Sequence, residues 1–290
     1  MGSPLRLTLA GIREPETDAA WALVSAVFSR AERDLTRWDA SSALSRLNRS
    51  VGAAVEVPRM LRRALAVAWR AFRMTRGRFD PRIIGALEIA GERAGVPLPS
   101  SPSVLSPGDR WIAVEPRRGH VRLDAPVDLG GIGKGLALRW SVAALERAGH
   151  QDFLLQAGGD LVARGVGPAG HPWIVGIQDP TGRRTALTNL ALRDAALATS
   201  SIAVRRWLAP DGTLRHHLID PASGTPADPV WLSVTVMVPD PAWAEVASKV
   251  GFLAGSGIGS ELAAVAAWWI APSGALQTSA IAQSAEHSAA

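Results

Sequence analysis

The spacing of apolar residues along the chain predicts several helices. One expected helix, over 17–35, carries apolar residues three or four positions apart: Trp21, Val24, Phe28, Ala31 and Leu35. Another is expected over about 58–75, where Pro58 stands at the start, a position that tolerates proline. Two further helices are expected over about 134–148 and 242–254.

Alternating or continuous apolar runs predict strands between these helices. Residues 5–10 (LRLTLA) alternate as a half-buried strand does, and 231–238 (WLSVTVMV) is the clearest β run. Other strands are expected over 152–157, 173–178 and 264–270. The Pro- and Ser-rich segment 96–109 is typical of a loop. Because helices and strands alternate, we expect an α/β fold of the mixed α+β kind.

The 290 residues, 47% of them hydrophobic, suffice for one substantial core or two packed lobes. We expect one domain over 1–276, followed by a small, polar and disordered tail over 277–290. There is no apolar run of about 20 residues, so no membrane span is expected. The first residues, MGSPLRLTLAG, lack the pattern of a signal peptide. As written, the chain predicts a cytoplasmic protein; a true start further upstream would permit an extracytoplasmic one.

Composition excludes some chemistry. Without Cys, the chain has no disulfide, catalytic thiolate or Cys-ligated metal centre. The formal charge is +5, and all 31 basic residues except Lys134 and Lys249 are Arg. These Arg residues are scattered and Tyr is absent, so the charge favours an Arg-rich surface over a nucleic-acid site.

A Gly-rich segment over 127–135 (VDLGGIGKG) leads directly into the expected helix at 134–148. Backbone amides at such a turn, the positive end of the helix and the charge of Lys134 suit a phosphate or pyrophosphate. Gly135 stands where a P-loop needs Ser or Thr, and the glycine spacing does not match the dinucleotide fingerprint. A Gly-rich turn with a surface Lys and no ligand is the alternative.

Two further segments carry polar groups next to turns. Asp160 ends the run AGGD after an expected strand, where it either faces a cleft or belongs to a plain turn. His216 and His217 precede a turn marked by Asp-Pro and Ser-Gly. A neutral His there is a candidate general base for a hydroxyl nucleophile, or else makes a structural hydrogen bond.

Glu245 and Lys249 stand four residues apart on the expected helix at 242–254, so they share a helix face. The simplest interpretation is an exposed ion pair, which stabilises a helix by about 0.3–0.5 kcal/mol. A role in binding is the alternative.

Taken in order over about 1–275, these segments and several others resemble the FAD:protein FMN transferase family, formerly called thiamine-biosynthesis lipoproteins. The matching segments are Met1–Ser3, Phe28–Arg30, Ser42–Asn48, Phe79–Pro81, Gly85–Gly91, Asp128–Gly135, Gly158–Asp160, Ala198–Ser200 and His217–Pro221. The resemblance implies two closely packed mixed-sheet lobes with an FAD cleft between them.

The resemblance also implies an activity. FAD is the substrate and Mg²⁺ a cofactor; a Thr or Ser hydroxyl of an acceptor protein attacks the FMN phosphorus, and AMP leaves. The alternatives are a non-catalytic FAD-binding or carrier protein, and an FAD pyrophosphatase that gives FMN and AMP.

The resemblance assigns roles to residues of this chain. His217 becomes the candidate catalytic residue, and the carbonyl of Gly131 and the side chain of Glu245 the candidate metal ligands. The expected FAD contacts are Met1, Gly91, Asp128, Lys134, Asp160, Thr199, Leu218 and Lys249.

The chain departs from the family where the late helix carries Asp and, four residues on, Thr as metal ligands. Here those positions hold Glu245 and Lys249. A charged Lys has no acceptor and cannot bind a metal. Either Lys249 replaces part of the cation's charge, or Mg²⁺ binds weakly or not at all. Glu92 stands where the family often has an aromatic, and Trp38 and Met1 are candidates for stacking on the flavin.

Overall fold

The computed structural model describes residues 3–11, 16–92, 95–98, 111–115, 119–209, 211–228, 230–254, 265–279 and 281–282. The chain divides into two compact units. Unit 1 comprises 1–28, 134–203 and 229–290, and unit 2 comprises 29–133 and 204–228. Helix α1 (Glu16–Leu35) passes from unit 1 to unit 2 after Phe28.

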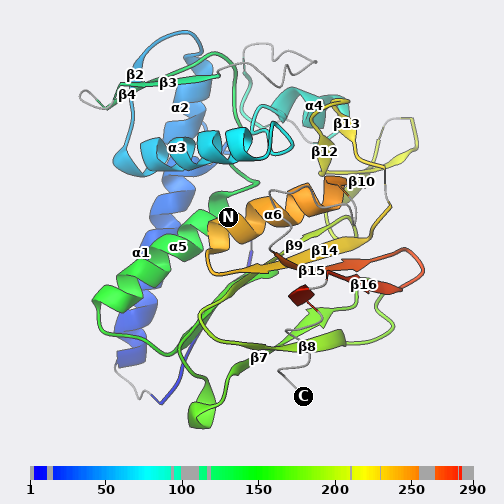
Figure 1. Cartoon of the computed structure of the whole chain (residues 1–290). Coiled ribbons are helices and arrows are strands. Elements are labelled where there is room, and N and C mark those ends of the chain that lie inside the picture. Colours follow the sequence, from blue (N-terminus) through cyan, green and yellow to red (C-terminus); the bar gives the residue numbers. More distant parts are fainter. Residues whose placement is uncertain are drawn as a thin grey trace. The chain divides into compact units, whose positions relative to one another are not determined.

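Unit 1 is built on a seven-stranded sheet in the order β1-β5-β6-β9-β14-β15-β16 (Figure 1). Its strands are β1 (Leu5–Leu9), β5 (Phe153–Ala157), β6 (Asp160–Arg164), β9 (Ala196–Ser201), β14 (Ser233–Val238), β15 (Ala266–Ile270) and β16 (Leu276–Thr278). Every neighbouring pair in this sheet is antiparallel. Strands β7 (Trp173–Gln178) and β8 (Ala186–Leu192) form a separate antiparallel pair, preceded by a short helix over Pro168–Gly170.

Two cores lie on opposite faces of this sheet because side chains alternate along its strands. On β6, Val162 belongs to a core shared with α1 and with α5 (Gly133–Arg147), whereas Leu161 and Ala163 belong to a core shared with β7 and β8. Helix α6 (Pro241–Ala254) packs along β9 and β14 (Figure 1). The helices therefore share one face of the sheet, and this arrangement brings the start of α5 to α6.

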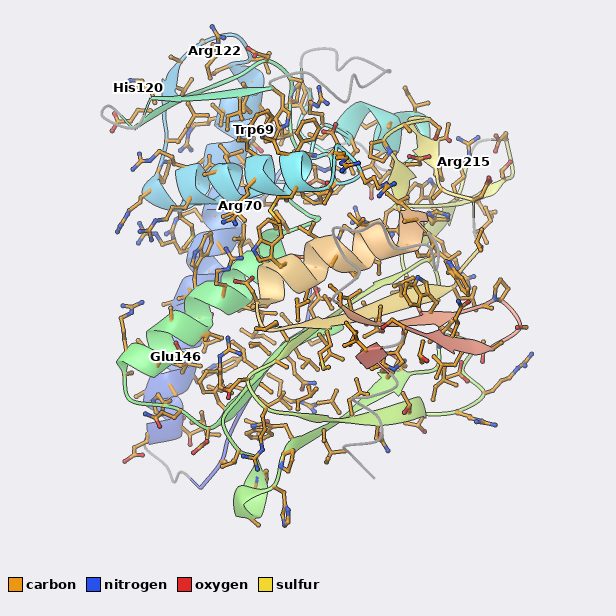
Figure 2. All side chains as sticks on the ribbon, viewed as in Figure 1. Trp69, Arg70, His120, Arg122, Glu146 and Arg215 are labelled. Carbon is orange, nitrogen blue, oxygen red and sulfur yellow. The ribbon has the colours of Figure 1, made fainter. Side chains whose placement is uncertain are left out.

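Unit 2 combines short helices with small sheets. Its elements are α2 (Ala43–Arg49), α3 (Arg59–Met74), α4 (Ile84–Ile89), the sheet β2 (Val55–Glu56), β4 (His120–Leu123) and β3 (Ile112–Glu115), and the pairs β10 (Arg206–Leu208) with β11 (Leu214–His216) and β12 (Ile219–Asp220) with β13 (Thr225–Pro226). On α3, Trp69 (Figure 2) stacks on Phe72 at 5.4 Å between ring centroids and meets the edge of Trp111 at 5.6 Å. These aromatic contacts anchor α3 in the core of unit 2.

The expected α/β fold is confirmed, and the four long helices and the expected strands agree with the structure to within two residues. Gln277 and Thr278, expected in a disordered tail, instead pair with β15, because an antiparallel partner strand satisfies their backbone groups. Residues 283–290 and most of the expected loop at 96–109 lie outside the described residues. Among the helices that the structure describes, none has the length and apolar character needed to cross a membrane.

Candidate functional site

Four charged side chains from three elements of unit 1 meet in one cluster, which we call the ammonium–carboxylate cluster. Lys134 is the second residue of α5, Asp160 begins β6, and Glu245 and Lys249 lie one turn apart on α6. The Lys134 Nζ lies 2.6 Å from Glu245 Oε1 and 2.9 Å from Asp160 Oδ2. The Lys249 Nζ lies 3.6 Å from the same Glu245 Oε1.

Gly135 explains how α5 comes so close to α6. A Cβ at this position would lie 2.6 Å from the Cα of Ala242 and against the carbonyl oxygen of Pro241, so only glycine fits this backbone contact. The close approach lets the Gly135 amide donate to Glu245 Oε2 at 2.8 Å. Gly135 stands where a P-loop has Ser or Thr, and its role here is to allow the close packing of α5 on α6.

Hydrogen bonds from β9 hold the other carboxylate. The Thr199 amide donates to Asp160 Oδ1 at 3.2 Å, and the Thr199 hydroxyl bonds to that of Thr235 at 2.9 Å. The hydroxyls of Ser200 and Ser248 are 2.8 Å apart and tie β9 to α6. Asp160 is therefore a fixed, buried carboxylate and not part of an exposed turn.

Glu245 is only 1% exposed, so the expectation of an exposed Glu245–Lys249 ion pair is wrong. The pair is buried because the helix face that carries it packs on β9 and β14. Burial alone would raise the pKa of Glu245, but the ammonium groups of Lys134 and Lys249 overcome this and lower it.

The other charges of the cluster are also shifted. Burial opposes the charge of Lys134, but the carboxylates of Glu245 and Asp160 more than offset this and raise the pKa of Lys134. Burial lowers the pKa of Lys249, because Glu245 offsets the loss of solvent only in part. Burial likewise raises the pKa of Asp160.

The cluster does not fit a magnesium ion. Glu245 Oε1 already accepts from Lys134 and Oε2 from Gly135, and the Lys249 ammonium occupies the position of the family's second ligand. No group of three or more His, Cys, Asp or Glu side chains suited to a metal occurs in the described part of the chain. Gly131, the other candidate ligand, lies in the turn before α5 and offers only backbone atoms.

The Gly-rich turn is also more self-contained than its sequence predicts. The Gly130 amide donates to Asp128 Oδ1 at 2.8 Å, and those of Ile132 and Gly133 donate to the Leu129 carbonyl at 3.1 and 2.7 Å. With the Gly135 amide bound to Glu245, these four amides are already engaged. These four amides are therefore not available to an anion.

Unit 2 contains a second group of charged residues, which we call the charge chain. Its members are Asp128, a candidate FAD contact, and Arg37, Glu92 and Arg205. The Arg37 Nε lies 3.6 Å from Asp128 Oδ2, and Arg37 Nη2 donates to Glu92 Oε2 at 2.6 Å. Arg205 pairs with Glu92 Oε1. The Arg37 guanidinium also stacks over Trp38, 3.9 Å from the ring centroid. Glu92, which stands where the family often has an aromatic residue, thus joins two arginines. It directly follows the candidate contact Gly91, which lies just after the C-cap residue of α4 and has a φ of 90°.

The two adjacent histidines of unit 2 have different surroundings. His216 is buried; its Nδ1 accepts from the Leu218 amide at 3.3 Å, and its Nε2 faces the Ala227 carbonyl at 3.1 Å. Burial lowers the pKa of His216, which favours the neutral ring with its proton on Nε2. His217 is half-buried, and its Nδ1 lies 3.2 Å from the Arg205 carbonyl. His216 is therefore structural, which leaves His217 as the candidate base.

The structure brings together Lys134, Asp160, Glu245, Lys249 and Thr199 in unit 1. Leu218, in unit 2, is buried, at 5% exposed. Met1 lies outside the described residues. Sequence reasoning missed Arg37 and Arg205, because nothing marks them among so many arginines until Glu92 is seen between them.

Comparison with known proteins places these observations in a family. The model of the ApbE family matches residues 1–268. The FAD:protein FMN transferase of Klebsiella pneumoniae (strain 342) is 27% identical over 252 residues, covering 82% of this chain and 72% of that protein. The FAD:protein FMN transferase of Treponema pallidum is 30% identical over 265 residues, covering 83% and 72%.

Solved structures share the fold. The ApbE protein of Thermotoga maritima matches with a TM-score of 0.83 at 24% identity, covering 98% of this chain and 96% of that one. Flavin transferase ApbE of Vibrio cholerae matches with a TM-score of 0.77 at 20% identity, covering 96% and 93%. The family model covers nearly the whole chain, including both lysines of the ammonium–carboxylate cluster, and the chain therefore belongs to the ApbE family.

Proposed function

We propose that this protein is an FAD:protein FMN transferase that moves the FMN part of FAD onto a Thr or Ser hydroxyl of an acceptor protein. The observation that carries the proposal is the ammonium–carboxylate cluster. Two buried carboxylates fix two ammonium groups side by side. Such a fixed pair of positive charges suits the pyrophosphate of FAD, and the relatives named above bear the name of this activity.

The reaction needs positioning and charge stabilisation more than covalent help from the protein. The acceptor oxygen forms a new bond to the FMN phosphorus. The bond from that phosphorus to the bridging oxygen breaks, and AMP leaves with the bonding electrons. The hydroxyl proton passes to a base, and no step draws on a metal ion.

We assign the role of base to His217. When its Nδ1–H donates to the Arg205 carbonyl, the neutral ring carries its lone pair on Nε2, which is the atom that takes the proton. Arg205 is itself paired with Glu92, so the charge chain of unit 2 positions this imidazole through the backbone at Arg205.

The test is labelling of a Thr-containing acceptor by the purified protein with FAD, followed by flavin fluorescence on a denaturing gel and by AMP release. A general base contributes about 10²- to 10⁴-fold in rate, so His217→Ala should slow labelling by at least about 10²-fold. His171→Ala, which alters an exposed His in unit 1, is the matched control. Labelling by His217→Ala at the wild-type rate would remove His217 from the reaction.

A second candidate, a non-catalytic FAD-binding protein, is favoured by the poor fit of the cluster to a metal. It predicts FAD binding with neither labelled acceptor nor AMP. Free FMN and AMP formed without an acceptor would instead identify a pyrophosphatase. The same incubation with and without acceptor therefore separates all three functions.

A further inference from the structure

The charges of the ammonium–carboxylate cluster balance without a metal ion. Each carboxylate oxygen already has a nitrogen neighbour: Thr199 N at 3.2 Å and Lys134 Nζ at 2.9 Å on Asp160, and Lys134 Nζ at 2.6 Å and Gly135 N at 2.8 Å on Glu245. The two ammonium groups already neutralise the two carboxylates, so a divalent cation would have to displace an ammonium group to bind these oxygens. The carboxylates are thus already paired with the lysines.

The two lysines are not paired equally closely with the carboxylates. Lys134 makes two short contacts with carboxylates. The Lys249 Nζ lies 3.4 Å from the Glu245 carbonyl oxygen and 3.6 Å from Oε1, both longer than the usual 2.7–3.2 Å. Within the residues that the structure describes, these are its polar contacts. Its side chain is 21% exposed, and its ammonium has three N–H donors for these two long contacts, so it can still donate to a ligand.

We propose that the Lys249 ammonium is the resident cation of this site. It binds the pyrophosphate of FAD where the family resemblance expects a divalent ion, and FAD binding therefore needs no Mg²⁺. The inference rests on the proposed function, because it takes FAD as the substrate. It assigns Lys249 a binding role that a helix-surface ion pair would not have.

The substitution Lys249→Thr replaces the ammonium with a hydroxyl that can bind a metal ion. It removes one positive charge beside Glu245 and supplies a hydroxyl oxygen one turn along α6. The cluster then carries a net negative charge and an added metal ligand, both of which favour Mg²⁺. The variant should bind FAD weakly without metal and recover when Mg²⁺ is added.

The experiment is titration of the full chain with FAD, followed by flavin fluorescence, in EDTA and in excess Mg²⁺. The wild-type Kd should be the same in both buffers. Loss of a charge-assisted hydrogen bond weakens binding by about tenfold or more, so Lys249→Thr should lose at least that in EDTA and regain most of it with Mg²⁺. Calorimetric titration with Mg²⁺ alone should give binding to Lys249→Thr and none to the wild type.

Arg193→Thr is the matched control, because it removes one positive charge from an exposed position of unit 1. It should leave the Kd and its metal dependence unchanged. Wild-type binding that requires Mg²⁺ overturns the inference while leaving the proposed function intact. This part of the experiment uses only the wild-type protein, so it does not depend on the folding of a variant. Unimpaired, metal-independent binding by Lys249→Thr also overturns it. Absence of FAD binding in both buffers overturns the proposed function itself.

Discussion

Glu245 is the residue on which the ammonium–carboxylate cluster depends most, and Glu245→Gln tests that dependence. The carboxylate is 1% exposed and has three nitrogen neighbours: the ammonium groups of Lys134 and Lys249 and the amide of Gly135. Gln has nearly the same size and shape but no charge. Its amide oxygen can still accept a hydrogen bond, so the substitution removes charge while it keeps packing.

The expected loss of stability follows from this environment. Removing one partner of a buried ion pair costs about 3–5 kcal/mol, because the other charge stays buried without compensation. Asp160 remains 2.9 Å from the Lys134 Nζ and retains part of the compensation. We therefore expect a loss of about 3 kcal/mol in the free energy of unfolding, a large part of the roughly 5–15 kcal/mol that stabilises most domains.

The assay is urea unfolding followed by circular dichroism. Glu146→Gln is the matched control, because Glu146 lies near the end of α5 (Figure 2), half-exposed, and pairs with Arg164 at 3.3 Å. Such a pair contributes about 0.2–1 kcal/mol. The double substitution Glu245→Gln with Lys249→Met should recover about 1 kcal/mol, since it removes an unbalanced charge. Equal losses for Glu245→Gln and the control would refute the buried-pair argument.

Three further predictions concern packing, pH and the charge chain of unit 2. Gly135→Ala should lower the free energy of unfolding in urea by about 1–3 kcal/mol, because its Cβ would meet the backbone of α6. Gly159→Ala is the control and should change little, because a Cβ there meets nothing within 4 Å. Because burial lowers the pKa of His216 from 6.5, the unfolded chain gains a proton first as pH falls below about 6.5, so stability should fall there. Unfolding over a pH series should show a smaller fall for His216→Gln, and an unchanged fall would contradict this. Glu92→Gln should cost about 3 kcal/mol, since it breaks the buried 2.6 Å pair with Arg37; a loss under about 1 kcal/mol would contradict it.

The sequence predicts the long elements of the fold well because their signal repeats. Helix α1 spans 20 residues with a regular apolar face, and β14 is a continuous run of strand-forming residues. The short elements lack enough repeats. Helix α2 has seven residues, and its clearest signal is Ser42, whose Oγ caps the helix by accepting from Ser45 N at 2.9 Å. Strand β9 (ALATSS) has few strand-forming residues and depends on pairing with β6 and β14.

The candidate site was predictable as a set of residues but not as a set of contacts. The sequence places Glu245 and Lys249 on one helix face, and that part is correct. It does not show that the face is buried, because burial arises when α6 packs on β9 and β14. It also does not show that Lys134, 111 positions earlier, shares the same carboxylate. An ion pair expected to matter little is thereby part of a four-charge cluster.

The choice of lysine at these two positions has a physical reason that composition alone suggests only weakly. All but two of the 31 basic residues are Arg, and both exceptions lie in the cluster. A guanidinium is planar and pairs best with a single carboxylate through two parallel bonds. The Lys134 ammonium instead bridges two different carboxylates, at 2.6 and 2.9 Å, which requires a compact group with donors in several directions. Lysine therefore fits a position where one ammonium must pair with two carboxylates. Lys134 thereby leaves the Lys249 ammonium for the pyrophosphate that we propose as its ligand.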